Sequence, residues 1–234
     1  MTERQWPQVQ VYRLAPDKHR WARGVLERAA KARGLSPTRA ELTGWAAVAA
    51  HETQYGSGWK PPMTGSNNWG AVQAKPGQPS AQWQDTHPDG TVYQQAFRVY
   101  STPEEGAGDV IRHLTTLRPK TAAAMRTGDW WAVADAMRQE RYFGGYCPQA
   151  SKKYGPAVRG VGSGAVESWP EAQRACHLEA FPRYAAILRA YARQIADAHG
   201  EKPLDEQASE GSSWWPLVLV AGAGAVWWHW RRKA

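Results

Sequence analysis

The sequence predicts a mainly α-helical fold of the α+β class: a helical lobe with a small β-hairpin lobe, followed by one C-terminal transmembrane helix. Apolar residues recur every three or four positions in several segments, which indicates amphipathic helices. A Pro-Asp-Gly turn at 88–90 separates strand-like residues, and the run 214–230 carries no charge. With 234 residues, 42% of them hydrophobic, the chain can bury one sizeable core with appendages.

Two helices are expected in the first quarter of the chain. The first begins with Asp17 as its N-cap and ends at Gly34, which can adopt the left-handed terminating conformation. The second starts after Ser36-Pro37, where Thr38 and Glu41 can form a capping box, and runs through about Gln54. The apolar stripes of the two helices are Trp21, Val25, Ala29 and Ala32, and then Leu42, Trp45, Ala46, Ala49 and Ala50.

Glu52 is placed on the buried stripe of the second helix. It lies seven residues after Trp45 and three after Ala49, so helical geometry points it along the packed face. Burial raises the pKa of a carboxyl, as a proton donor near neutral pH requires. The alternative is an ion pair with one of the many arginines. A zinc-protease reading of His51-Glu52 fails because Tyr55 stands where the second histidine belongs.

The later elements follow from similar signals. Residues 83–100 are expected to form a β-hairpin that turns at 88–90. A capped helix starts at Thr102, Pro103 and Glu105, and another at Asp129. The stripes of these helices and of a final helix are Ala107, Val110, Ile111 and Leu114; Trp130, Val133 and Met137; and Tyr184, Ile187, Leu188 and Tyr191.

The charge and the cysteines narrow the classes of partner. A net charge of +8 suggests a polyanion, either nucleic acid, anionic lipid or an acidic cell-wall polymer. Helix-turn-helix, RNP and zinc-finger signatures are absent and the basic residues are scattered, which argues against nucleic acid. Cys147 and Cys176 lack zinc-ligand spacing. They are either paired or simply buried, and pairing would indicate an oxidising, non-cytoplasmic location.

The two ends of the chain differ. The start has charges at once and no apolar core, so it is not a secretory signal. The run 214–230 spans about 25 Å as a helix, has Trp at both ends and precedes three basic residues, which places the main domain on the non-cytoplasmic side. The expected organisation is a domain at 1–198, a polar linker at 199–213, a transmembrane helix at 214–230 and a basic tail at 231–234.

Three segments together resemble a known family. They are HETQYGS at 51–57, GSNNWGAVQ at 65–73 and FRVYSTPEEGAGDVIRHL at 97–114. This combination is similar to the glucosaminidase branch of the lysozyme-like superfamily, glycoside hydrolase family 73, and the resemblance covers about residues 17–195. It implies a lysozyme-like fold that cleaves a β-1,4 bond between the amino sugars N-acetylglucosamine and N-acetylmuramic acid of peptidoglycan, without a metal or other cofactor.

The resemblance also implies roles for individual residues. Glu52 would protonate the leaving oxygen. The second carboxylate of the family precedes the hairpin turn, where this chain has Asp85, although an Asp beside such a turn is often only a turn former. An Asn pair in a glycine-bounded turn can hold either backbone carbonyls or a ligand's amide. The substrate-binding residues implied are Asn67, Asn68, Trp69, Tyr100, Tyr142 and Tyr146.

Several alternatives stay open at this stage. Without a second carboxylate, the substrate's own N-acetyl group could assist hydrolysis, or the enzyme could be a lytic transglycosylase that needs one acid. A wall-cutting domain without a signal peptide but with a C-terminal anchor favours a virion-associated lytic protein of a phage. The other candidates are a bacterial envelope-remodelling enzyme and an inactive wall-binding module. Oligomeric state and the choice of bond are not predicted.

Overall fold

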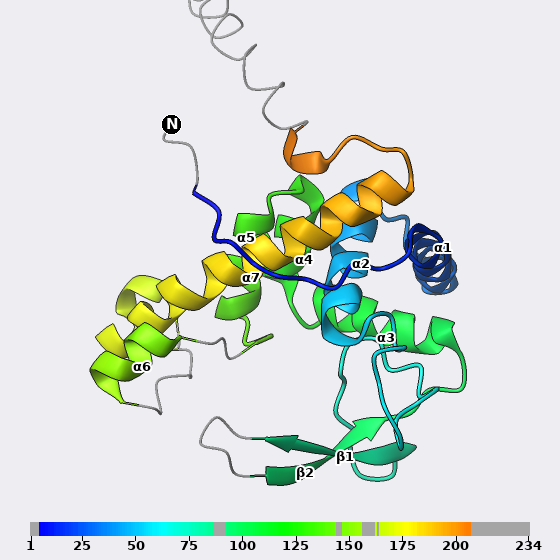
Figure 1. Cartoon of the computed structure of the whole chain (residues 1–234), viewed down its shortest axis with the longest axis horizontal. Coiled ribbons are helices and arrows are strands. Elements are labelled where there is room, and N and C mark those ends of the chain that lie inside the picture. The colour runs from blue at the N-terminus through cyan, green and yellow to red at the C-terminus, as the bar shows by residue number, and fades with distance from the viewer. Residues whose placement is uncertain (1–4, 87–91, 144–146, 156–161, 163, 207–234) are drawn as a thin grey trace, which may run out of the picture.

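The computed structural model describes residues 5–86, 92–143, 147–155, 162 and 164–206, which form a helical lobe above a two-stranded hairpin (Figure 1). This arrangement confirms the expected mainly helical fold with a small antiparallel sheet. The elements are α1 (Pro16–Ala32), α2 (Arg39–Thr53), β1 (Ser80–Thr86), β2 (Val92–Arg98), α3 (Pro103–Thr115), α4 (Pro119–Thr127), α5 (Trp130–Gln139), α6 (Pro148–Tyr154), the 3-10 helix η1 (Val166–Ser168) and α7 (Glu171–Ala198).

Helix α2 is the centre of the helical lobe. Every residue from Ala40 to Ala50 is buried, and the helix packs against α1, α3, α4 and α7. Most of these buried residues are small or apolar and they occur on every side of the helix, which is typical of a helix in the centre of a core. The expected capping box is confirmed: the Thr38 side chain accepts from the Glu41 backbone N–H, and Glu41 accepts from the backbone N–H of Thr38.

The other helix starts are predicted with mixed success. Thr102 and Asp129 cap α3 and α5 as expected. Asp17 does not cap α1, because that helix begins one residue earlier at Pro16, and Asp17 instead pairs with Arg20 on the surface. Trp21 is 44% exposed, so its assignment to the buried stripe of α1 is wrong.

The hairpin pairs β1 with β2 in antiparallel register, from Ser80 opposite Arg98 to Thr86 opposite Val92. Its expected turn at 88–90 lies outside the described residues. The hairpin packs on the preceding loop through Trp59, whose ring contacts those of Trp83 and Phe97 at centroid distances of 5.3 and 5.1 Å.

Two segments without regular structure are fixed to the helical lobe. Residues 5–15 cross α7 (Figure 1), where Gln194 bonds the backbone of Leu14 and Tyr12, and Trp6 packs edge-on against Trp131. Residues 199–206, expected as the start of the linker, also pack on the helical lobe, where Glu201 pairs with Arg23 of α1. The folded domain therefore extends beyond residue 198.

The remaining linker, the expected transmembrane helix at 214–230 and the basic tail lie outside the described residues. Within the part of the chain that is described, no helix combines the length and the hydropathy that a membrane span requires. The anchor at 214–230 thus stays a prediction of the sequence.

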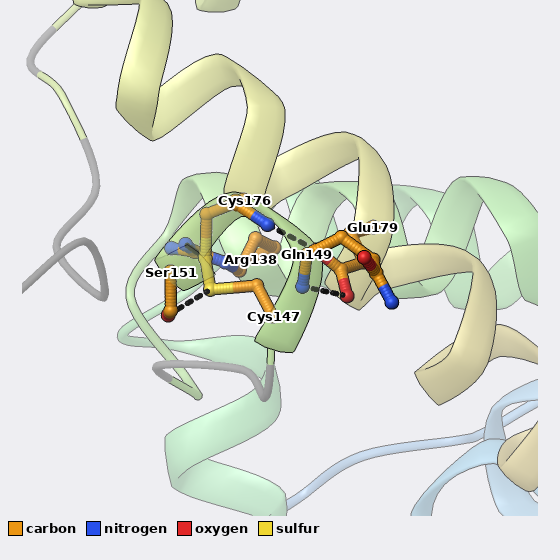
Figure 2. Close-up of a disulfide and its surroundings, with 7 residues drawn as sticks. Arg138, Cys147, Gln149, Ser151, Cys176 and Glu179 are labelled. Carbon is orange, nitrogen blue, oxygen red and sulfur yellow. Dashed lines mark hydrogen bonds between the residues drawn. A yellow bond between two sulfur atoms is a disulfide. The ribbon is translucent and has the colours of Figure 1, made fainter. Parts of the chain in front are cut away.

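Cys147 and Cys176 are paired, which decides between the two alternatives left by the sequence. The bond joins the start of α6 to α7 across a separation of 29 residues (Figure 2). Glu179 strengthens the same junction by accepting hydrogen bonds from the backbone N–H groups of Gln149 and Ala150. Beside the bond, the fully buried Arg138 donates to Cys176 Sγ at 3.5 Å. Helix α6, which the sequence did not predict, is therefore held to α7 at its N-terminal end.

Gly106 is needed for the contact between α3 and the 65–70 turn. A Cβ at Gly106 would lie 1.8 Å from the carbonyl oxygen of Asn67, whereas a Cβ at Gly108, on the same helix, would meet its nearest neighbour, the Arg33 side chain, at 3.6 Å. We expect Gly106→Ala to lower the free energy of unfolding by about 3 kcal/mol, and Gly108→Ala to raise it by up to about 1 kcal/mol. Urea denaturation of the two variants checks this, and equal midpoints would contradict the close approach.

Candidate active site

A cleft of about 660 Å³ opens between the helical lobe and the loop that precedes the hairpin. Glu52, in the last turn of α2, lies in its lining. The loop 70–78, helix α3 and the segment after α5 form the remaining walls. The lining residues are Glu52, Gly70, Ala71, Val72, Gln73, Lys75, Gln78, Arg98, Asp109, Arg112, His113, Leu117, Arg118, Arg141, Tyr142 and Phe143.

Glu52 is a carboxyl without a cationic partner among the described residues. Its Oε1 accepts a hydrogen bond of 3.1 Å from Tyr184 Oη, which comes from the middle of α7. Burial raises the pKa of Glu52 to about 7, and the bond from Tyr184 opposes that rise only in part. The ion-pair alternative is therefore wrong for this residue, and the inward orientation predicted from the helical spacing is confirmed.

Aromatic rings form the surroundings of this acid. Phe143 stacks on Tyr184 with centroids 4.2 Å apart, and His51 packs edge-on against Tyr184 at 5.2 Å. Tyr142 also lines the cleft. The pKa of its phenol is raised far above the usual value, mainly by burial and to a lesser extent by the nearby Glu52 carboxylate. Tyr142 therefore belongs to the cleft lining, and its role in binding substrate stays a prediction.

The two asparagines hold backbone. Asn68 is fully buried: its Nδ2 donates to the carbonyls of Val72 and Arg98, and its Oδ1 accepts from the Val72 N–H, all at 2.9 Å. Asn67 Nδ2 donates to the Tyr100 carbonyl at 3.1 Å. Of the two interpretations of this Asn pair, the structure supports the backbone one. The pair fixes the loop whose residues 70–73 line the cleft.

Trp69 and Tyr100, expected as substrate-binding residues, do not line this cleft. Trp69 is 1% exposed and packs against the rings of Tyr55 and Trp21. Tyr100 is buried and donates its hydroxyl to Asp109. Burial of both rings leaves them no face for a ligand in this cleft, which corrects the expectation. Tyr146 lies outside the described residues.

Asp109 is a carboxylate that shares the cleft with Glu52. Asp85 is on β1, where its backbone is opposite Tyr93, and its role as the second carboxylate stays a prediction of the sequence. Asp109 pairs with Arg112 at 2.7 Å and with Arg98 at 3.1 Å. Burial alone would raise its pKa, but the hydrogen bond from Tyr100 and the pair with Arg112 lower it, so Asp109 is ionised.

Sequence reasoning missed Asp109 and the role of Tyr184. A signal for Asp109 existed, because an acid beside Ala107, Val110 and Ile111 on a capped helix is as unusual as Glu52 on its own stripe. Tyr184 was assigned to an apolar stripe, and nothing local marks its hydroxyl as a partner of Glu52. The resulting pair of carboxyls differs in charge near neutral pH: Glu52 can donate a proton, whereas Asp109 is an anion.

Comparisons with known proteins show only distant structural similarity to this chain. No family model matches the sequence, and no curated protein matches it. The structure is similar to a peptidoglycan hydrolase from Sphingomonas sp. A1, with 16% identity, a TM-score of 0.46 and coverage of 79% of this chain and 95% of that one. It is also similar to the glycoside hydrolase domain of FlgJ from Salmonella typhimurium, with 18% identity, a TM-score of 0.45 and coverage of 89% and 99%. Because these identities and TM-scores are low, the likeness carries no functional argument, and function follows from the cleft itself.

The raised pKa of Glu52 predicts a pH-dependent cost to folding. The pKa is about 7 in the folded chain against 4.5 for an ordinary glutamate, so the unfolded chain releases this proton first as pH rises. The stability of the native protein relative to Glu52→Gln should therefore fall between about pH 4.5 and 7, by up to about 3 kcal/mol. Urea unfolding of both proteins across this range measures the difference. A constant difference would mean that the carboxyl is not desolvated.

The hydrogen bond from Tyr184 leads to a second prediction, which concerns the pKa of Glu52. Its hydrogen bond favours the ionised form of Glu52, so Tyr184→Phe should raise the pKa of that carboxyl further, by about one pH unit. A ¹³C NMR titration of labelled glutamate carboxyls measures this value directly. Tyr154→Phe, which removes a tyrosine–carboxylate bond to Glu171 on the surface, serves as control and should leave Glu52 unchanged.

Proposed function

We propose that this chain is a glycosidase of peptidoglycan and that Glu52 is its general acid. The observation that carries the proposal is a carboxyl in a cleft whose pKa, at about 7, keeps it protonated near neutral pH. In the reaction, Glu52 gives its proton to the glycosidic oxygen while the bond from that oxygen to the anomeric carbon breaks and an oxocarbenium-like centre develops. The leaving sugar departs as an alcohol and Glu52 becomes a carboxylate.

The residues around Glu52 prepare this proton transfer. Tyr184 fixes the orientation of Oε1, and the stacked Phe143 keeps Tyr184 in place. The buried rings exclude water, which maintains the raised pKa. After the transfer, Tyr184 remains as a donor to the new carboxylate, so that it stabilises the product state more than the ground state.

The second half of the reaction has two candidate routes. Asp109 is ionised and lies in the same cleft, and its charge favours a cationic transition state. Its oxygens are also bonded by two arginines and Tyr100, which makes it a weak base for activating water. Two routes without a catalytic base therefore remain candidates: hydrolysis assisted by the substrate's N-acetyl group, and internal attack by a muramic acid hydroxyl, as in a lytic transglycosylase. Asp85 of the hairpin remains the alternative second carboxylate.

For location we propose a membrane-anchored lytic protein of a phage particle, with its domain on the non-cytoplasmic side. This proposal rests on the sequence features of 214–230. The alternative is a bacterial envelope-remodelling enzyme. Purified particles should contain the protein and give a lytic band in a peptidoglycan gel.

Digestion of purified peptidoglycan by the full chain in mild detergent tests the activity. Mass spectrometry of the products distinguishes reducing ends from anhydro sugars and identifies the bond that is cut. Glu52→Gln should lower the rate at least 100-fold, whereas Glu27→Gln, which removes an exposed carboxylate paired with Arg23 on α1, should not. If Glu52→Gln left all function untouched, the chain would be an inactive wall-binding module instead.

A further inference from the structure

The cleft lining contains two chemically different groups of side chains. Aromatic rings surround Glu52, and five cationic side chains, here called the cationic wall, line the same cleft: Lys75, Arg98, Arg112, Arg118 and Arg141. Tyr142 lies between the two, because its phenol is close to Glu52 and its ring lies 5.0 Å from the Arg118 guanidinium. Among the residues that the structure describes, no cation is close enough to Glu52 to lower its pKa.

The cationic wall has more charge than its own carboxylate neutralises. Asp109 pairs with Arg98 and Arg112. Lys75 and Arg141 are exposed at the rim, and Arg118 gives its Nη1 to the carbonyl of His113. Within the described residues, Lys75, Arg118 and Arg141 have no salt bridge to a carboxylate. Arg118 is also close enough to the Glu140 carboxylate to be stabilised by its charge, so the surplus positive charge of the described cleft lining rests mainly on Lys75 and Arg141.

Neutral sugars do not need such a wall. An uncharged glycan is bound by hydrogen bonds and apolar surface, and cations near a general acid lower its pKa and oppose its retention of a proton. A cluster of cations set apart from the acid by an aromatic ring is instead complementary to an anionic substituent bound beside the scissile bond. Peptidoglycan carries carboxylates on its muramic acid side chain, either at the lactyl group or on the attached peptide.

We propose that the cationic wall binds a carboxylate of the glycan's muramic acid substituent, so that the enzyme prefers acidic peptidoglycan over uncharged amino-sugar polymers. This inference rests on the proposed function. Lys75 and Arg141 are the discriminating residues, because they are the exposed members of the wall and have no internal bond to lose when they are replaced.

The test compares teichoic-acid-free sacculi with the same sacculi after carbodiimide amidation, which converts carboxylates to amides and leaves the sugar chain intact. Wild-type kcat/KM should fall about 5-fold on the amidated sacculi, as expected for two exposed ionic contacts. The full-chain double variant Lys75→Gln/Arg141→Gln should show that loss already on untreated sacculi and little further loss on amidated ones.

The control is the double variant Arg13→Gln/Lys31→Gln, which removes the same number of charges at exposed positions outside the cleft. It should keep the wild-type preference. The inference is overturned if Lys75→Gln/Arg141→Gln retains the full preference for untreated over amidated sacculi, or if the control loses it. Either result leaves the glycosidase proposal unaffected. Equal thermal unfolding of both variants confirms that folding is intact.

Two further arms complete the design. An amidase removes the peptide carboxylates and frees the lactyl carboxylate, which is amide-bonded wherever a peptide is attached. Cleavage of this stripped glycan as fast as untreated sacculi shows that the lactyl carboxylate can make the contact, and slow cleavage assigns the contact to the peptide. If no preparation is cleaved, the proposed function fails. Co-sedimentation of the wild-type chain and both double variants with untreated and amidated sacculi then tests carboxylate binding alone, with equal binding of the wild type to both overturning it.

Discussion

The structure depends on one constraint, the burial of an ionisable carboxyl at the end of a helix that lies in the centre of the core. Every residue of α2 from Ala40 to Ala50 is buried, and Glu52 in its last turn is desolvated as well. The only hydrogen bond to that carboxyl in the described chain comes from Tyr184, 132 residues further on. Two distant parts of the sequence must therefore fold together before the acid acquires its pKa, and the capping box that sets the start of α2 also sets where Glu52 emerges.

The remaining cleft lining depends on contacts that hold the 70–73 loop and helix α3 close to Glu52. Asn68 uses its whole side chain to fix the 70–73 loop, and Gly106 allows α3 to approach that turn without a side chain between them. Helix α3 then brings Asp109 and Arg112 into the lining of the cleft that also holds Glu52. The two carboxyls of this cleft have different partners: Glu52 accepts a hydrogen bond from Tyr184, whereas Asp109 pairs with Arg98 and Arg112.

Local signals in the sequence were sufficient to predict much of the fold and part of the candidate site. The capping box of α2, the Thr102 cap of α3, the inward direction of Glu52 and the hairpin all follow from local spacing, and the structure confirms them. The errors arise where tertiary contacts decide. Nothing local distinguishes an asparagine that binds a sugar from Asn68, which binds Val72 and Arg98, or a stacking platform from the buried ring of Trp69. Arg112 is a local partner of Asp109 on α3, but the second partner, Arg98, becomes its neighbour only when β2 and α3 are placed together.

The pair Cys147–Cys176 has a consequence for anyone who handles the molecule. A chain produced in a reducing cytoplasm and one matured in an oxidising compartment are different chemical species, separated by two hydrogen atoms. The oxidised species has fewer unfolded conformations available and so melts at a higher temperature. An intact mass, measured before any assay, therefore reports which of the two species a given batch contains.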